Sequence, residues 1–200
     1  MNRSEGKSPI LVFALAGILA ATAACGTDQA ESAPAEAMVT PKQMADALHA
    51  VLEADRTVYT RNVVNRLQNE EQVILASEHW QDDKALPLPA QMFRMGSELA
   101  AEKSSDFSYA LLSLWPVNKQ NAPKSEVERV GLQFVVDNFG ENYYSEEVLG
   151  TQKYFTAVYP DVAVAEACTS CHNGHIDSPR DDFAMGDVMG GVVVRIPLRE

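Results

Sequence analysis

Residues 142–159 read NYYSEEVLGTQKYFTAVY, two runs rich in aromatic and β-branched residues that flank Gly150. Glycine readily adopts the backbone conformations of a tight turn, so this stretch predicts an antiparallel hairpin. Two further β-prone runs are Phe107–Trp115, before the hairpin, and Gly190–Leu198, after it. Together these runs predict an antiparallel sheet in the C-terminal half of the chain.

Helical patterns precede this sheet and interrupt it. Thr40-Pro41-Lys42-Gln43 combines an N-cap threonine, a proline at the first helical position and a capping-box glutamine. Apolar residues then recur at helical spacing, which predicts a long amphipathic helix that ends at about Gln68. Further helices are expected at Glu70–Lys84, Ala90–Lys103 and Ser125–Gly140. This order of elements predicts an α+β fold.

The stretch Cys168-Thr169-Ser170-Cys171-His172 carries the chemistry. Two thiols at this spacing suit addition to the two vinyl groups of one porphyrin, and the adjacent histidine is then directed at the iron. The motif therefore predicts one covalently attached haem c. Cys168 and Cys171 would form the thioether bonds, and His172 would be the proximal iron ligand.

Three other readings of this cysteine pair have less support. A disulfide across two residues would be strained. A thioredoxin-like redox pair is expected at a helix start after a βαβ pattern, which this sequence lacks. A zinc site could use His175, but no second cysteine pair is available, since the chain has three cysteines in all.

The sixth iron ligand has several candidates. Met92 and Met95 share one face of the expected helix Ala90–Lys103, and a thioether is a standard partner of His-ligated haem. A methionine pair at helical spacing is equally typical of core packing. His49 lies at the flank of the apolar stripe of the first helix, and His79 lies in a polar stretch.

The N-terminus predicts export. A short basic start precedes an uncharged, mostly apolar run, Pro9–Ala24, which is shorter than the roughly 20 residues needed to cross a bilayer and typical of a signal-peptide core. Cys25 directly follows small residues, a placement that resembles a bacterial lipobox, although Thr22 stands where leucine is usual. We expect residues 1–24 to be a signal peptide and Cys25 to be lipidated. The alternative is an ordinary signal peptide that leaves Cys25 as a free thiol.

Residues 25–40 are rich in Ala, Glu, Ser and Pro and predict a flexible tether, which would hold the domain of residues 41–200 away from a membrane. The net charge of −12 argues against binding to nucleic acid, whose phosphates require Lys and Arg. We expect membrane contact through the lipid anchor only, on the periplasmic side of a bacterial membrane, and the outer membrane rather than the inner.

In the order of its segments, the chain resembles a family of single-haem c-type domains with a PAS-like fold, first described from a cyanobacterial protein and also found in extracytoplasmic parts of sensor kinases and chemoreceptors. The resemblance covers about Met44–Leu198. It rests on five segments: Asp55–Thr60, Pro116–Pro123, Tyr154-Phe155, Cys168–His172 and Gly186–Gly191. It implies a PAS-like antiparallel sheet with helices packed on it and the haem between sheet and helices.

The same resemblance bears on the sixth ligand. In the cyanobacterial member the distal ligand is a cysteine on a helix before the segment that corresponds to Pro116–Pro123, called the Asn/Pro segment below, and this chain has no cysteine there. The comparable region is Ala90–Leu99, which holds both methionines. We therefore expect Met92 as the distal ligand, with Met95 and His49 as alternatives.

The expected function is electron transfer or redox poise with a redox partner protein, because a covalently fixed one-electron cofactor occurs without evident substrate machinery. The alternative is a sensor, in which haem redox state or a bound gas changes how the domain contacts a separate partner protein. An enzyme with an open iron site would need an acid–base residue above the iron. The sequence identifies none, so we do not expect an enzyme.

Overall fold

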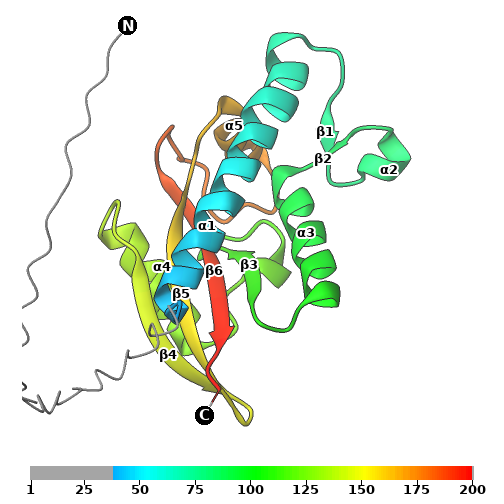
Figure 1. Cartoon of the computed structure of the whole chain (residues 1–200). Helices are drawn as coiled ribbons and strands as arrows, with labels where there is room; N and C mark the ends of the chain where they lie inside the picture. Colours follow the sequence, from blue (N-terminus) through cyan, green and yellow to red (C-terminus); the bar gives the residue numbers. More distant parts are fainter. Residues whose placement is uncertain (1–37, 200) are drawn as a thin grey trace, which may run out of the picture. The chain divides into compact units, whose positions relative to one another are not determined.

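A four-stranded antiparallel sheet forms the centre of the computed structural model, which describes residues 38–199. The strand order is β3-β6-β5-β4, so β6 lies between β3 and β5 (Figure 1). The strands are β3 (Ser108–Leu112), β4 (Tyr143–Leu149), β5 (Gln152–Val162) and β6 (Val188–Pro197). Gly150, between β4 and β5, has a φ of 63°, as the tight turn of the predicted hairpin requires.

Helices cover both faces of this sheet (Figure 1). They are α1 (Pro41–Val58) and α3 (Pro89–Lys103) on one face and α4 (Glu126–Asp137) on the other. Because side chains alternate along a strand, Val192 and Val194 pack in the core under α1 and α3, whereas Val193 packs in the core under α4. The expected α+β fold, an antiparallel sheet with helices packed on it, is confirmed.

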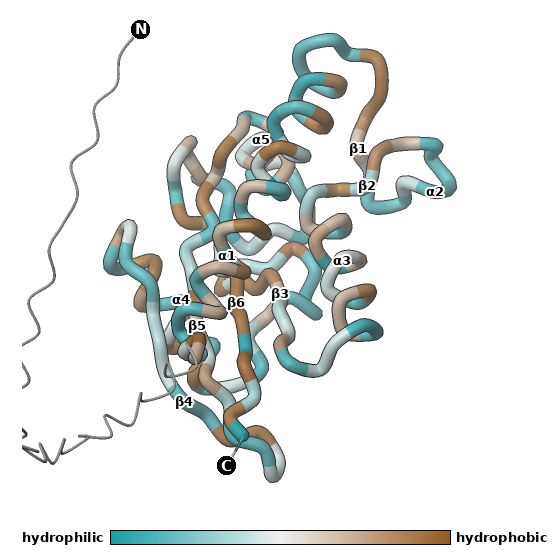
Figure 2. The backbone as a smooth tube through the Cα atoms, viewed as in Figure 1, coloured by the Kyte–Doolittle hydropathy of each residue, from teal (hydrophilic) through white to brown (hydrophobic). Residues whose placement is uncertain are grey.

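Strand β6 is buried on both faces. Every residue from Val188 to Val194 is buried, and Figure 2 shows the strand as one of the apolar parts of the backbone, in contrast to the hydrophilic segment around α2. A Cβ atom on Gly190 would lie 2.4 Å from the carbonyl oxygen of Leu112, and one on Gly191 would lie 2.8 Å from Leu132. The two glycines therefore allow neighbouring groups to approach the strand closely.

A buried charge cluster joins α4 to the sheet. Arg195 of β6 donates to Glu128 of α4 and to Glu147 of β4, each over 2.7 Å. Thr156 also donates to Glu147, over 2.8 Å. Glu128 additionally closes the predicted capping box with Ser125. Because the carboxylates are almost fully buried, at 4% and 5% exposure, the shared guanidinium group compensates their charge.

The first helix changes type halfway along its length. Thr40 and Gln43 form the predicted capping box, and α1 runs from Pro41 to Val58. From Tyr59 to Glu70 the chain continues as a π-helix, η1, in which backbone groups pair five residues apart. The predicted end at about Gln68 is close to the observed end. The π-helical geometry was not predicted.

The predicted helix over Glu70–Lys84 is wrong. Three short elements occupy the region: β1 (Ala76–Ser77), α2 (Trp80–Asp83) and β2 (Leu86–Pro87), with β1 and β2 paired in parallel. Gln72 and Lys84 adopt left-handed backbone conformations, with φ of 54° and 52°. Such residues cannot continue a right-handed helix, so the segment forms the projection seen beside α3 in Figure 1.

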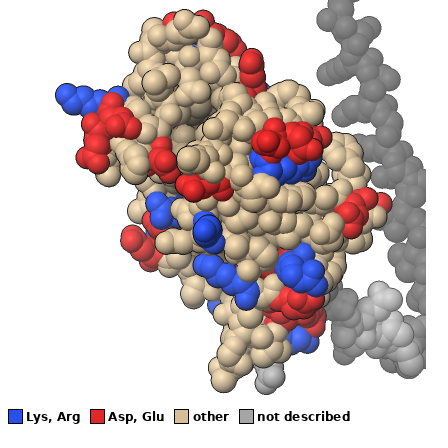
Figure 3. Space-filling model, turned by 180° about the vertical axis from the view of Figure 1, so that it is seen from behind, with Lys and Arg blue, Asp and Glu red and all other residues tan. Residues whose placement is uncertain are grey.

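The surface carries both signs of charge. On the face shown in Figure 3, basic side chains lie in small groups next to acidic ones. Among residues 38–199, no helix has the length and apolar composition required to span a bilayer. The predicted signal peptide (residues 1–24), Cys25 and most of the predicted tether lie outside the described residues.

Candidate haem site

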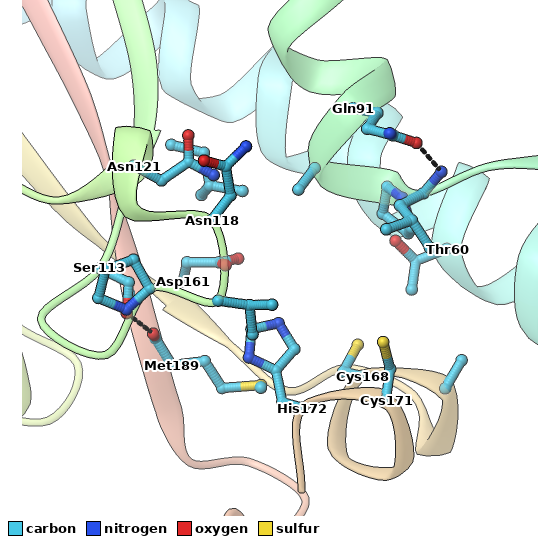
Figure 4. Close-up of a pocket in the computed structure, with 18 of the residues that line it drawn as sticks. Thr60, Gln91, Ser113, Asn118, Asn121, Asp161, Cys168, Cys171, His172 and Met189 are labelled. Atoms are coloured by element: carbon cyan, nitrogen blue, oxygen red, sulfur yellow. Dashed lines mark hydrogen bonds between the residues drawn. The ribbon is translucent and has the colours of Figure 1, made fainter. Parts of the chain in front are cut away.

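A cavity of about 240 Å³ lies at one end of the sheet. Its wall is built from α1 and η1, the N-terminal turn of α3, strands β3 and β6, the loop of residues 113–121 and a helix, α5 (Glu166–Gly174). A void that holds one water occupies roughly 10–15 Å³. This cavity is therefore far larger than a packing defect, and Figure 4 shows its interior.

Helix α5 carries the cysteine–histidine motif. Cys168, Cys171 and His172 all line the cavity, and Figure 4 shows their side chains pointing into it from the same helix. Residues three and four positions apart lie on one helix face, which explains how the motif presents all three groups together. The sequence did not predict this helix, because residues 166–174 have no apolar repeat.

Two asparagines fix the position of α5. Asn65 of η1 accepts a hydrogen bond from the backbone N–H of Ala167 over 3.3 Å. At the other end, the carboxamide of Asn173 donates to the carbonyl of Phe183 over 2.9 Å and accepts from its N–H over 3.0 Å. The motif is thereby tied to η1 on one side and to the loop before β6 on the other.

The two thiols of the motif are not joined in a disulfide. Cys171 is exposed, but nearby protein atoms partly desolvate its thiol, and this effect, with smaller contributions from Cys168 and Glu78, raises the pKa of the thiol. Within residues 38–199, His, Cys, Asp and Glu side chains form no group of three or more that could hold a metal ion. The disulfide and zinc readings therefore gain no support.

The imidazole of His172 is held by ring packing. It lies edge-on against Phe183, with ring centroids 5.9 Å apart and planes at 89°. Phe183 packs edge-on against Trp115, and the guanidinium of Arg180 lies 4.3 Å from the Phe183 centroid. The Nδ1 atom of His172 is buried without a hydrogen-bond partner among the described residues. Burial and nearby positive charge lower the pKa of His172, which favours a neutral imidazole able to bind a metal.

An ion pair lies in the cavity wall on the side of the sheet. Arg56 of α1 donates to Asp161 of β5, and the two side chains are 13% and 12% exposed. Burial raises the pKa of Asp161, and the adjacent Arg56 opposes that shift. The Nε atom of Arg56 is buried without a partner among the described residues. The wall thus holds one positive and one negative group in contact.

The family model described as Tll0287-like matches residues 33–197, most of the chain. The chain belongs to the Tll0287-like family. It is also similar to a solved structure described as the cyanobacterial heme-protein Tll0287, with 13% identity and a TM-score of 0.51, over 81% of this chain and 99% of that chain. Among curated proteins, no match was found. At this identity the match shows a shared fold, and the family expected from the order of segments is confirmed.

In this member of the Tll0287-like family, neither methionine of α3 lines the cavity. The helix contributes Pro89, Ala90, Gln91 and Arg94 to the wall. These four residues lie on the face of α3 that borders the cavity, and Met92 and Met95 are not among the residues that line it. The geometry therefore does not support the expectation that Met92 is the distal ligand.

His49 does not line this cavity either. Its ring stacks on Tyr159, with centroids 3.9 Å apart and planes at 7°, and it borders a separate cavity of about 10 Å³. Its Nε2 atom is buried without a partner among the described residues, and burial lowers the pKa of the imidazole. His49 is thus packed between α1 and β5.

Three wall residues of this cavity were not identified from the sequence. Met189 lines the cavity and packs in a buried cluster with Cys168, on the side of His172 (Figure 4). Asn118 and Asn121 line it from the Asn/Pro segment. The polar turn composition of that segment could have suggested the asparagines. Met189 lies near the start of β6 and gives no such signal.

Proposed function

We propose that this chain binds one haem c in the cavity, with thioether bonds from Cys168 and Cys171 and an axial bond from His172. The observation that carries this proposal is that all three motif side chains line a cavity of about 240 Å³ from one face of α5. Membership of the Tll0287-like family supports it, since the solved structure that the chain resembles is a heme-protein by its description.

The surrounding residues suit this role. Bound there, the haem would supply an iron centre that gains and loses one electron. The two cysteines would fix its edge, and the neutral imidazole of His172, oriented by Phe183, would offer its lone pair. Leu111, Leu112 and Met189 line the cavity from the sheet side and would exclude water from the group.

We place the protein in electron transfer or redox poise rather than in catalysis. Covalent attachment keeps the cofactor in place through repeated cycles of oxidation and reduction, which suits an exported carrier. The signal peptide and a lipid on Cys25 would hold this carrier on the periplasmic side of a bacterial membrane, the outer one by our expectation. Its electrons would pass to or from a separate redox protein.

Haem attachment is tested by producing the full chain in the periplasm together with a c-type haem attachment system. The wild type should retain haem after denaturing electrophoresis and give a pyridine haemochrome spectrum of one haem per chain. The Cys168→Ser/Cys171→Ser double variant should lose this haem. Ser170→Ala, between the two cysteines but exposed, is the matched control and should keep it. A wild-type chain without covalent haem would contradict the proposal.

The proposed carrier function and anchor are tested separately. Spectroelectrochemistry of the haem-loaded protein should give a reversible one-electron transition, and small redox mediators should reduce and reoxidise it. A haem that exchanges electrons with no mediator would exclude the carrier function. Cys25→Ser should move the protein from the membrane to the soluble periplasmic fraction, with its haem retained.

A second candidate function is sensing through a separate partner protein. The wall of the cavity across from His172 favours it, because Asn118 and Asn121 supply uncharged polar groups there. Limited proteolysis of oxidised, reduced and CO-treated protein tests this candidate. Identical cleavage patterns in all three states would remove its basis.

A further inference from the structure

The groups in the described cavity wall that ligate haem iron well all come from one side. Cys168, Cys171 and His172 belong to α5, His175 is its C-cap residue, and Met189 lies near the start of β6. Met189 shares a buried cluster with Cys168, and Figure 4 shows its side chain beside His172. In Figure 4 the side chains of Cys168, Cys171, His172 and Met189 all lie on one side of the cavity.

The opposite side of the cavity presents a different chemistry. Figure 4 shows Thr60, Gln91, Asn118 and Asn121 on the side of the cavity away from the motif, with Asp161, which is paired with Arg56, between Asn118 and His172. The first four side chains carry hydroxyl and carboxamide groups and Asp161 a carboxylate, whereas proteins hold haem iron with His, Cys, Met or Tyr. A haem bound by His172 on one face would meet only weak ligands among the described residues on its other face.

Two of these four residues are already committed to the fold. The hydroxyl of Thr60 donates to the carbonyl of Arg56 over 2.7 Å. The carboxamide of Gln91 accepts from the N–H of Leu88 over 3.0 Å and donates to the carbonyl of Glu78 over 2.7 Å. The single hydroxyl hydrogen of Thr60 is therefore used, and Gln91 keeps only one free amide hydrogen on a carboxamide already held at both its oxygen and its nitrogen.

Asn118 and Asn121 are fixed in place but keep hydrogen-bonding capacity. The Oδ1 atom of Asn118 accepts from the N–H of Gln120 over 3.0 Å, which orients the carboxamide and leaves its NH₂ group to donate elsewhere. The backbone of Asn121 bonds to Asn118 and to Ser113, each over 2.9 Å, while its side chain makes no hydrogen bond among the described residues. The loop therefore holds two carboxamide donors at the cavity wall.

We infer that the sixth iron position is open in this protein and takes an uncharged diatomic ligand, such as CO or NO on the reduced haem, with Asn118 and Asn121 as hydrogen-bond donors to its outer atom. This inference rests on the proposed haem attachment. Electron carriers whose haem iron is bound by two protein side chains have no such site for an external ligand. The charges nearby favour a neutral ligand, because Arg56 is already paired with Asp161 and the chain as a whole carries −12.

Absorption and resonance Raman spectra of the reduced, haem-loaded full chain test the open position directly. We expect a five-coordinate, high-spin spectrum and one-step binding of CO at a rate proportional to CO concentration. A six-coordinate, low-spin spectrum with CO binding at a rate independent of its concentration would overturn the inference, since a protein group would then occupy the position. Haem staining of the same sample separates this failure from failure of haem attachment.

The donors are tested by Asn118→Leu and Asn121→Leu, which keep the number and branching of the side-chain heavy atoms. Loss of a donor should shift the infrared stretching frequency of bound CO to a higher value. It should also raise the NO dissociation rate about two- to tenfold, which corresponds to the net free energy of one hydrogen bond. Gln120→Leu, in the same loop but not in the cavity wall, is the control and should leave both unchanged. If neither asparagine variant shifts the CO stretch relative to Gln120→Leu, the assignment of the donors is wrong.

Discussion

Asp161 places a carboxyl group in the wall of the proposed haem cavity, in contact with Arg56. A negative charge near the iron favours the oxidised, more positive state. In general, a unit charge about 10 Å from another contributes roughly 1–2 kcal/mol at an effective dielectric constant of about 20. We expect Asp161→Asn to raise the haem reduction potential, measured by spectroelectrochemistry. Asp55→Asn removes an exposed charge from α1 and is the control. Equal potentials for Asp161→Asn and the wild type would contradict the assignment.

Glu147 gives the fold an acid-sensitive contact. Burial alone would raise the pKa of Glu147, but hydrogen bonds from Arg195 and Thr156 outweigh it and hold the pKa below its ordinary value of 4.5. The ionised form is therefore stabilised in the folded state. This contribution is complete above pH 4.5 and is lost as the pH falls through the lower pKa of the folded protein.

We expect Glu147→Gln to lower the free energy of unfolding at pH 7 by about 1.5–3 kcal/mol, the value of hydrogen bonds to a charged group. The difference from wild type should shrink as the pH falls below about 4, as measured by urea unfolding across that range. Glu146→Gln, next to it but 53% exposed and facing Lys153, should change stability by less than about 1 kcal/mol. A constant difference at every pH would rule out the proposed ionisation.

At the scale of elements, α4 approaches the sheet closely because Gly131 has no side chain. A Cβ atom there would lie 2.6 Å from Val158 and 2.7 Å from Tyr143. We expect Gly131→Ala to reduce the free energy of unfolding by about 1–3 kcal/mol through overpacking, measured by urea unfolding. Gly174→Ala, at the end of α5 with nothing within 4 Å, should be neutral or stabilise by up to about 1 kcal/mol. Equal changes in the free energy of unfolding for the two variants would show that α4 and the sheet have room for a larger side chain at residue 131.

The elements differ in how far the sequence predicted them. The helices that begin at Thr40 and Ser125 have capping boxes, and Gly150 marks the hairpin, so local chemistry was sufficient there. Residues 71–88 follow no such rule, because their short strands pair only in the folded molecule. Helix α5 has no apolar repeat and is held in place by hydrogen bonds between Asn65 and Ala167 and between Asn173 and Phe183. Contacts between residues far apart in the sequence leave no periodic pattern of apolar residues from which they could be predicted.

The same contrast divides the candidate site. Cys168, Cys171 and His172 were predicted as haem-binding residues because their spacing along the chain is itself the signal. The opposite wall combines Thr60 with Asn118 and Asn121, which come together only when η1 and the Asn/Pro loop meet at the end of the sheet. Met92 was expected as a ligand from its residue type and helix. The helix exists, but its orientation, which the sheet determines, puts Gln91 in the wall instead.

At the scale of the whole molecule, the sheet has its own cores, whereas the cavity would be filled by the haem. We expect the haem-free Cys168→Ser/Cys171→Ser protein to keep the sheet but to open around the cavity. Hydrogen–deuterium exchange should be faster than in the haem-loaded protein in η1 and residues 113–123, with β5 and β6 still protected. Faster exchange throughout β5 and β6 would mean that the fold as a whole depends on the haem.

The inward direction of the motif side chains has a consequence for biogenesis. The sulfur atoms of Cys168 and Cys171 face a space whose wall is built from segments between Arg56 and Gly190, so this wall forms only after distant parts of the chain have met. An attachment enzyme must reach those sulfurs from outside. We therefore expect maturation to have a fixed order in time: translocation as an extended chain, capture of the porphyrin by a still-open polypeptide, and closure of η1 and α3 over it as the final step.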